Sequence, residues 1–241
     1  MADAEKEPAP PLVWTKDRRT PRRQAPSVEQ IVRTALAIAD TEGLSGLSMR
    51  RVAAELRSGT ASLYRYVAGR DELLDLMIDE VHGAEAPPAL TGEWRTDLAN
   101  VARQVRTTLL RHPWLGTELT GRPALGANSL RQHDVALTAA GALTPDITLA
   151  TRVVDTVMAY VFGAVAQELA EIQARQRTGL TEEQWQASVG PYIREVVESG
   201  AYPEFARRVI EAEETGPDDQ FEFGLRCVLD GVGAHPGRGG R

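Results

Sequence analysis

The stretch LSMRRVAAELRSGTASLYRYVAGRDELLDLMI, residues 47–78, decides the fold of the N-terminal part of the chain. Ser48 can cap a short helix whose apolar residues then recur at helical spacing. Residues 57–59 (Arg-Ser-Gly) form a tight break, and Thr60 can cap a second short helix that runs from about Ala61 to Val67. Two short helices with apolar inner faces, joined by a turn that contains glycine, predict a helix-turn-helix.

The outer face of the second helix carries the side chains suited to DNA. Leu63 and Val67 lie four residues apart and face inward, which turns Tyr64 and Arg65 outward by about 100° and 200°. A recognition helix reads bases through such side chains, and an arginine can contact guanine with two hydrogen bonds. The alternative is that the tyrosines only pack and the arginines are only solvated. We predict DNA contacts for Arg50, Thr60, Ala61, Ser62, Tyr64, Arg65, Tyr66 and Arg70.

The rest of the chain also has helical periodicity. A capping box at Ser27 and Gln30 opens a first helix, which Gly43 can end, and a fourth helix is expected over residues 70–82. Beyond a linker at residues 82–92, helices are predicted from Trp94, over 124–140, from Thr144 as cap to Gln176, after a capping box at Thr181, from Tyr192, from Glu204 and over 218–232. No run alternates as a strand does, so we predict an all-α fold.

Four regions follow from this pattern. We predict a disordered basic arm at residues 1–26, a helix-turn-helix domain at 27–82, a regulatory and dimerisation domain at 93–233 and a flexible tail at 234–241. Arginines 18, 19, 22 and 23 give the arm its charge, and it either touches DNA or is simply solvated.

Charge and composition restrict the class of protein. Residues 16–70 hold 11 Lys and Arg against five Asp and Glu, a net charge of +6. Because the whole chain has a net charge of −7, the remaining residues carry a net charge of −13. A basic front on an acidic body indicates that only the front meets phosphate. The N-terminus lacks the apolar core of a secretory signal, and the apolar run at residues 157–166 is about half a membrane span. Cys227 has no cysteine partner, so we predict a cytoplasmic protein without a membrane segment.

Three segments carry a resemblance to a known family: ALAIADTEGLSGLSMRRVA (35–53), SLYRYV (62–67) and DELLDL (71–76). Together they resemble the DNA-binding domain of the TetR family of regulators over about residues 27–82. The resemblance implies that Thr60, Ala61, Ser62, Tyr64 and Arg65 face bases or backbone, and that Arg50, Tyr66 and Arg70 lie near phosphates. Arg65 stands where the tetracycline repressors carry tryptophan, so the operator need not be theirs.

The C-terminal part is similar to the regulatory domain of the tetracycline repressors at Gly121-Arg122-Pro123, at residues 160–163 (YVFG) and at residues 221–225 (FEFGL). That similarity implies a homodimer in which the helices at about 145–176 and 218–232 pair with their two-fold mates as a four-helix bundle. The alternative is that their apolar faces are ordinary core within one chain. The faces proposed for the dimer consist of Val153, Val157, Val161, Ala164, Leu225, Val228 and Leu229.

The effector site is predicted from residue types. The family's tetracycline–magnesium site uses a histidine just before a Gly-Thr-Arg-Pro segment, and residues 117–123 contain none. The four histidines have no metal spacing, so we expect no metal, no cofactor and a ligand other than tetracycline. A pocket needs apolar walls with a few polar groups. On that basis the predicted ligand-binding residues are Trp114, Asn128, His133, Tyr160 and Phe162.

These observations predict a DNA-binding repressor that a small-molecule ligand releases from its operator. A transcriptional activator, or a regulator that senses no ligand, stays open as the alternative. An enzyme is not expected, because the chain has no Ser/His/Asp set, no G-x-S-x-G, no P-loop and no dinucleotide-binding fingerprint.

Overall fold

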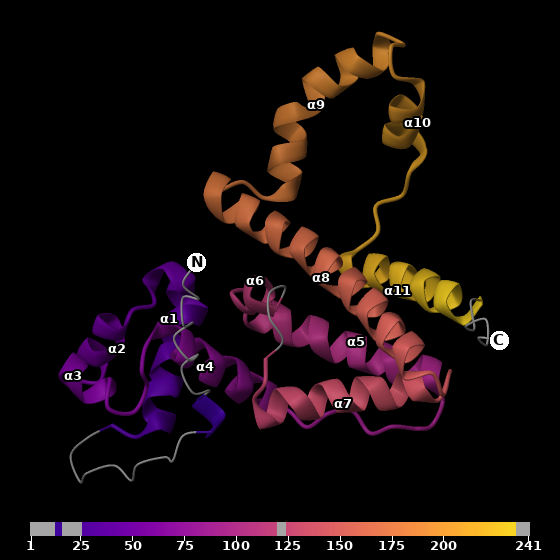
Figure 1. Ribbon diagram of the computed structural model, residues 1–241. Helices are drawn as coiled ribbons and strands as arrows, with labels where there is room; N and C mark the ends of the chain where they lie inside the picture. Colours follow the sequence, from indigo (N-terminus) through magenta and orange to yellow (C-terminus); the bar gives the residue numbers. More distant parts are fainter. Residues whose placement is uncertain (1–12, 16–25, 120–123, 235–241) are drawn as a thin grey trace, which may run out of the picture. The chain divides into compact units, whose positions relative to one another are not determined.

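The computed structural model describes residues 13–15, 26–119 and 124–234. These residues form α-helices and one short 3-10 helix, with no strand among them, which confirms the all-α prediction (Figure 1). The helices are η1 (Val13–Thr15), α1 (Val28–Gly46), α2 (Met49–Glu55), α3 (Thr60–Leu63), α4 (Arg70–Ala84), α5 (Trp94–Arg111), α6 (Leu115–Leu119), α7 (Ala127–Gly141), α8 (Ile147–Thr178), α9 (Glu182–Glu198), α10 (Pro203–Glu211) and α11 (Pro217–Ala234).

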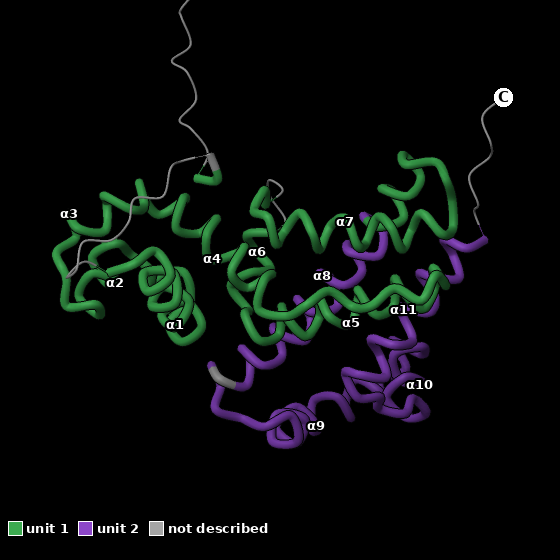
Figure 2. The backbone as a smooth tube through the Cα atoms, turned by 90° about the horizontal axis from the view of Figure 1, so that it is seen from below, with its two compact units in different colours: residues 1–154 green, residues 155–241 purple. Residues whose placement is uncertain are grey.

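The chain divides into two compact units, residues 1–154 and 155–241, and helix α8 passes from the first to the second (Figure 2). This division falls at a different place from the linker expected at residues 82–92, so the functional domains stay a prediction. The predicted arm lies outside the described residues apart from residues 13–15 and 26, and so does the predicted tail apart from Ala234.

Local capping signals position the first two helices as the sequence predicts. The Ser27 hydroxyl accepts from Gln30 N at 3.2 Å, and the Gln30 side chain accepts from Ser27 N at 2.9 Å, which completes the capping box. Gly43 takes a positive φ of 69° inside α1, so the helix kinks there and a final turn continues to Gly46. Ser48 caps α2 by accepting from Arg51 N at 3.1 Å.

Two expected caps are wrong. The residue before α3 is Gly59, which has no side-chain cap, so Thr60 is the first residue of that helix and not its cap. At the start of α8, the Asp146 carboxylate accepts from Thr148 N at 2.9 Å. The Thr144 hydroxyl instead accepts from the backbone amide of the capping residue, Asp146 N, at 3.2 Å.

Three elements differ from the expected ones. Helix α3 ends at Leu63 and is followed by turns, with Val67 N still donating to Leu63 O at 3.0 Å. Helix α6 was not predicted, because five residues between a proline and the segment at 120–123 are too short to show periodicity. Residues 182–198 form one helix that contains Pro191, where two helices were expected.

Within the first unit, α7 packs against both α4 and α5, and α1 packs on α2 and α4. The side chains at their centre are fully buried because each helix turns its apolar stripe inward. They include Ile31, Val52, Leu63, Val67, Leu73, Met77, Leu98 and Leu109.

Within the second unit, α8 and α11 are joined through Tyr160, whose hydroxyl donates to Phe221 O at 2.7 Å. Gly224 permits this approach, because a Cβ there would overlap the Tyr160 ring. Helices α9 and α10 pack on each other and bury none of their residues fully. Several of their apolar side chains are therefore exposed, including Trp185, Tyr192, Tyr202 and Ile210.

Most of the α8 and α11 side chains predicted to face a second copy are already buried in this chain. Val153, Val157, Val161, Leu225 and Leu229 are each at most 4% exposed, so the alternative of an intrachain core holds for them. Ala164 and Val228 are half-buried.

Residues 147–175 of α8 are long and apolar enough to cross a membrane by length and composition alone. The apolar run at residues 157–166 lies inside this helix. One such helix is weak evidence, since the core helix of a globular protein passes the same test.

Candidate DNA-binding surface and effector cavity

The recognition segment, residues 60–67, is held in place by two fully buried side chains, Leu63 and Val67, each 0% exposed. Between them Tyr64 is 51% exposed, Arg65 is exposed and Tyr66 is half-buried. The outward geometry expected for residues 64 and 65 is therefore present, although the α-helix proper ends at Leu63.

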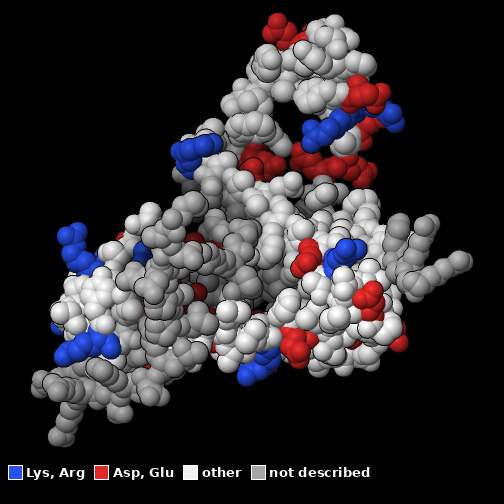
Figure 3. Space-filling view, viewed as in Figure 1, with Lys and Arg blue, Asp and Glu red and all other residues white. Residues whose placement is uncertain are grey.

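The predicted DNA residues lie close together in sequence on α2, on the segment 60–66 and at the first residue of α4. Arg50, Ala61, Arg65 and Arg70 are exposed, and Thr60 and Ser62 are half-buried. Figure 3 shows basic side chains at the surface of this part of the molecule. The arrangement gives a polar and cationic surface that suits a phosphate backbone and base edges.

Local hydrogen bonds orient two of these arginines. Arg65 Nη2 donates to Ser62 Oγ at 3.0 Å, which holds the guanidinium beside the exposed end of α3. Arg70 Nη2 donates to Leu44 O at 3.3 Å and so ties the start of α4 to the end of α1. Arg51, in contrast, is paired with Glu42 at 2.9 Å and Glu55 at 2.6 Å, so its charge is already balanced within the protein.

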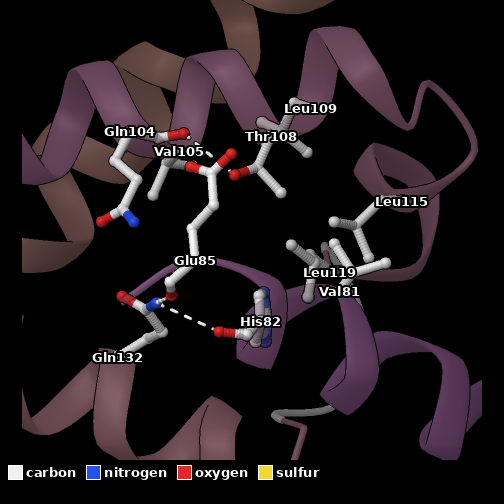
Figure 4. Close-up of a pocket in the computed structure, with 10 residues that line it drawn as sticks. All are labelled: Val81, His82, Glu85, Gln104, Val105, Thr108, Leu109, Leu115, Leu119 and Gln132. Atoms are coloured by element: carbon white, nitrogen blue, oxygen red, sulfur yellow. Dashed lines mark hydrogen bonds between the residues drawn. The ribbon is translucent and has the colours of Figure 1, made fainter. Parts of the chain in front are cut away.

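A cavity lies between α4, α5, α6 and α7 (Figure 4). It contains about 400 Å³ of empty space, part of it open to solvent. Its apolar walls and its polar edge are both what a small-molecule site requires. The apolar walls are Val81, Val105, Leu109, Leu115 and Leu119, and the polar edge is His82, Glu85, Gln104, Thr108 and Gln132.

Two glutamines of this edge hold the C-terminal end of α4. Gln132 Nε2 donates to His82 O at 3.2 Å, as drawn in Figure 4, and to Glu85 O at 3.4 Å. Gln104 Nε2 donates to Ala86 O at 2.9 Å. The last carbonyls of a helix have no partner within it, so the bond to His82 O satisfies a group that α4 leaves open, and the bonds to Glu85 O and Ala86 O fix the backbone just after the helix.

His82 and Asp79, one turn apart on α4, meet the N-terminus of α7. His82 Nδ1 lies 2.8 Å from Ser129 Oγ. Burial lowers the pKa of His82, and the nearby Asp79 carboxylate opposes that shift. Asp79 Oδ1 accepts from Asn128 N and Ser129 N, both at 2.9 Å, and thus caps α7 from another helix.

None of the five residues predicted to bind ligand lines this cavity. The Trp114 indole donates to Asp40 Oδ1 at 2.8 Å, the Asn128 amide donates to Asp79, and the Tyr160 hydroxyl donates to Phe221 O. His133 is exposed and Phe162 half-buried, and both Tyr160 and Phe162 belong to the second unit. Their predicted role in ligand binding stays untested.

The sequence did contain a signal for the missed cavity residues. Gln104 and Thr108 are four residues apart on α5 and share a face with Val105 and Leu109. Polar side chains on an otherwise apolar helix face are the pattern expected of a lined cavity.

Comparison with known proteins agrees with this architecture. Residues 86–235 match the family model described as "Tetracyclin repressor-like, C-terminal domain". The chain is 43% identical over 230 residues to the HTH-type transcriptional repressor DrrR1 of Streptomyces coeruleorubidus, covering 92% of this chain and 83% of that protein.

A solved structure is similar over nearly the whole chain. It is the Streptomyces coelicolor TetR family protein ActR in complex with actinorhodin, with a TM-score of 0.73 and 28% identity, covering 89% of this chain and 99% of the other. A helix-turn-helix head joined to helices that surround a cavity defines a DNA-binding transcriptional regulator. This chain belongs to the TetR family.

The family consists of transcription regulators and not of enzymes, in agreement with the sequence prediction. Among the described residues, no three His, Cys, Asp or Glu side chains are grouped so that they could hold a metal ion.

Proposed function

We propose that this protein is a repressor that binds operator DNA as a homodimer and leaves it when a small molecule occupies the cavity between α4 and α7. One observation carries the proposal: α4 begins at Arg70, three residues after Val67, and its last turn supplies Val81 and His82 to the cavity, with Glu85 just beyond the helix end. The same helix therefore reaches from the DNA-reading segment to the effector site. The repressor DrrR1, at 43% identity, supports repression over activation.

In this proposal Tyr64 and Arg65 read base edges, while Arg50, Tyr66 and Arg70 contact phosphates. Thr60, Ala61 and Ser62 approach the bases or the backbone beside them. The exposure of Tyr64 and Arg65 between two buried anchors supports this assignment. Two heads about 34–36 Å apart would then enter successive major grooves.

The effector we expect is a largely apolar compound with hydrogen-bonding groups on one edge. Val105, Leu109 and Leu115 give it apolar contact, and Gln104, Thr108 and His82 can exchange hydrogen bonds with it. No Lys or Arg is among the cavity's described lining residues, which disfavours a strongly anionic ligand. Because the similar protein ActR binds actinorhodin, that compound is the first one to test.

The dimer would use α8 and α11 through faces other than the valines first predicted. On α8 the exposed residues Thr156, Ala159, Gly163 and Ala166 recur at helical spacing, and they are small enough for two helices to approach closely. On α11, Phe223 is 57% exposed. A symmetric pair built from these two faces buries both copies of each. As a DNA-binding regulator, the dimer would work in the cytoplasm.

The DNA-reading part of the proposal is tested with an operator duplex recovered by selection from random-sequence DNA. The Tyr64→Ala, Arg65→Ala double variant should lose at least tenfold in affinity for that duplex and most of its preference over unrelated DNA, because one bidentate arginine–guanine contact alone is worth about 1–3 kcal/mol. Arg177→Ala is the matched control, because it also removes one arginine charge but lies on α8, outside the DNA-binding residues. Equal affinity and selectivity in a folded double variant contradicts the assignment.

The effector part is tested by filling the cavity. Val105→Phe should act as a permanent effector and lower operator affinity, whereas Val209→Phe on exposed α10 should not. Titration of actinorhodin into the protein–operator complex is the second measurement. A reporter gene under the recovered operator then separates repression, where loss of the protein raises expression, from activation, where it lowers it.

A further inference from the structure

A polar link joins the DNA-binding head, helices α1 to α4, to the segment between α5 and α6 beside the cavity. Asp40, on the last straight part of α1, accepts two hydrogen bonds through the same carboxylate oxygen. His112 Nδ1 lies 2.7 Å from Asp40 Oδ1, and Trp114 Nε1 donates to it at 2.8 Å. Both donors come from the segment 112–114, between α5 and α6, which lies 72 residues and more further along the chain.

The link is held in a fixed geometry. Trp114 is 5% exposed, and its ring lies edge-on to the His112 ring with centroids 6.2 Å apart. His112 N donates to Thr108 O at 2.9 Å and so closes the last turn of α5, while Leu115 N donates to His112 O at 2.9 Å. Pro113 restricts the backbone between the two donors. A tightly bonded segment of three residues cannot move without moving its hydrogen-bond donors.

The same segment connects two walls of the cavity. Thr108 and Leu109 line it from α5 just before the segment, and Leu115 and Leu119 line it from α6 just after. A molecule that separates Leu109 from Leu115 must therefore displace the Trp114 indole relative to Asp40. On the other side of the link, α1 packs against α2 and α4. A displacement of Asp40 therefore moves α1 and, through these contacts, the other helices of the DNA-binding head.

We infer that Asp40 is a positioning residue for effector response. Its hydrogen bonds to His112 and Trp114 hold the head in the orientation that binds operator, and occupation of the cavity breaks them. The inference rests on the proposed function, because it assumes that the cavity controls operator binding. An effector shifts such an equilibrium only through its different affinity for the two states, so the link must be made in one state and broken in the other.

The experiment is a double-mutant cycle on affinity for the selected operator duplex, with Val105→Phe as the built-in effector. In the otherwise unchanged protein, Val105→Phe should lower the affinity at least tenfold. In Asp40→Ala the affinity is already lowered, and Val105→Phe should lower it less than threefold further. Asp40→Asn keeps an acceptor oxygen at the same place and should restore most of the response. Thr41→Ala, which removes only hydrogen bonds within α1, is the control.

A spectroscopic readout keeps the inference testable if Asp40→Ala folds poorly. Trp114→Phe removes one donor and identifies the Trp114 indole proton in a ¹H–¹⁵N spectrum. That resonance should be slow to exchange in the unchanged protein and should exchange faster in Val105→Phe.

The outcomes separate the inference from the proposed function. If Val105→Phe weakens operator binding by the same factor with and without Asp40, or leaves the Trp114 indole proton protected, the cavity still regulates but the link does not transmit. If Val105→Phe has no effect in the unchanged protein, the regulatory role of the cavity fails and the inference fails with it.

Discussion

Arg57, in the turn of the helix-turn-helix, has a backbone conformation that is unusual for its type. Its φ is +50°, in the left-handed region where glycine normally ends a helix. Ser58 N donates to Ala53 O at 2.9 Å and Arg57 N to Ala54 O at 3.1 Å, the two hydrogen bonds of a Schellman motif. The turn that sets the angle between α2 and α3 therefore depends on a residue that tolerates this conformation.

Substitutions at Arg57 should separate side chains by their tolerance of positive φ. Arg57→Val should lower stability by about 1–2 kcal/mol, since a β-branched side chain is most restricted there. Arg57→Gly should change it by less than about 0.5 kcal/mol, because relief of the strain is offset by the greater entropy of glycine in the unfolded chain. Urea unfolding measures both. Equal stabilities for the two variants would contradict the role of the turn geometry.

His82 makes stability depend on pH. Burial lowers its pKa below the usual 6.5 in the folded protein, so the unfolded chain binds the proton first as the pH falls. Stability should therefore drop as the pH falls below about 6.5, until the folded protein also takes up the proton. Thermal unfolding at pH 7.5 and pH 5.5 measures the drop, and His82→Gln should reduce it. A His82→Gln variant with an undiminished drop would assign it to other groups.

Among the elements, α7 is capped by a side chain from α4. Its own N-cap residue, Gly126, has no side chain to offer, and the Asp79 carboxylate accepts from the first backbone amides instead. A carboxylate at a helix N-terminus is also favoured by the helix dipole. Since Asp79 and His82 both reach α7, the capping interaction joins the effector cavity to the helix that leads from the DNA-reading segment.

Gly126→Ala should destabilise the protein by about 2 kcal/mol, because the new Cβ would overlap the Asp79 carboxylate and displace it from the α7 amides. Gly141→Ala, at the other end of the same helix, is the matched control. Its Cβ meets nothing within 4 Å, and alanine is the better helix former, so stability should be unchanged or slightly raised. Thermal unfolding of the two variants compares them directly, and equal losses would contradict the close fit at Asp79.

At the scale of the whole molecule, the proposed dimer can be tested at Gly163, on the exposed face of α8. A Cβ at Gly163 meets nothing within 4 Å in one chain, so Gly163→Arg should leave the protomer folded. If two copies pack through this face of α8, the arginine must enter a close helix contact and the dimer should dissociate. Sedimentation should then give a monomer, and operator affinity should fall by more than tenfold because the two heads act separately. Gly190→Arg on α9, equally unobstructed, should stay dimeric.

Several features could be predicted from the sequence because they are local. The capping boxes at Ser27 and Thr181, the cap at Ser48 and the inward positions of Leu63 and Val67 all depend on residues within one or two helical turns. Family membership was predicted from residues 35–53, 62–67 and 71–76, and the comparisons confirm it. Helix α6 was missed because its five residues are too few to show periodicity. The cap of α8 was assigned to Thr144 and not to Asp146 because both are capping residue types close to the start of the helix.

The amino-acid order alone was enough for the all-α class, most helix positions and the exposed Tyr64–Arg65 pair, since hydrogen bonds and side-chain periodicity within a helix act over a few residues. It did not indicate which helix faces meet. The cavity draws its lining from residues 81–132 on four helices, and only their packing brings His82, Thr108 and Gln132 to one place. Packing also gave Trp114, Asn128 and Tyr160 internal hydrogen-bond partners and buried the valines of α8 within the chain, because such contacts join residues distant in sequence.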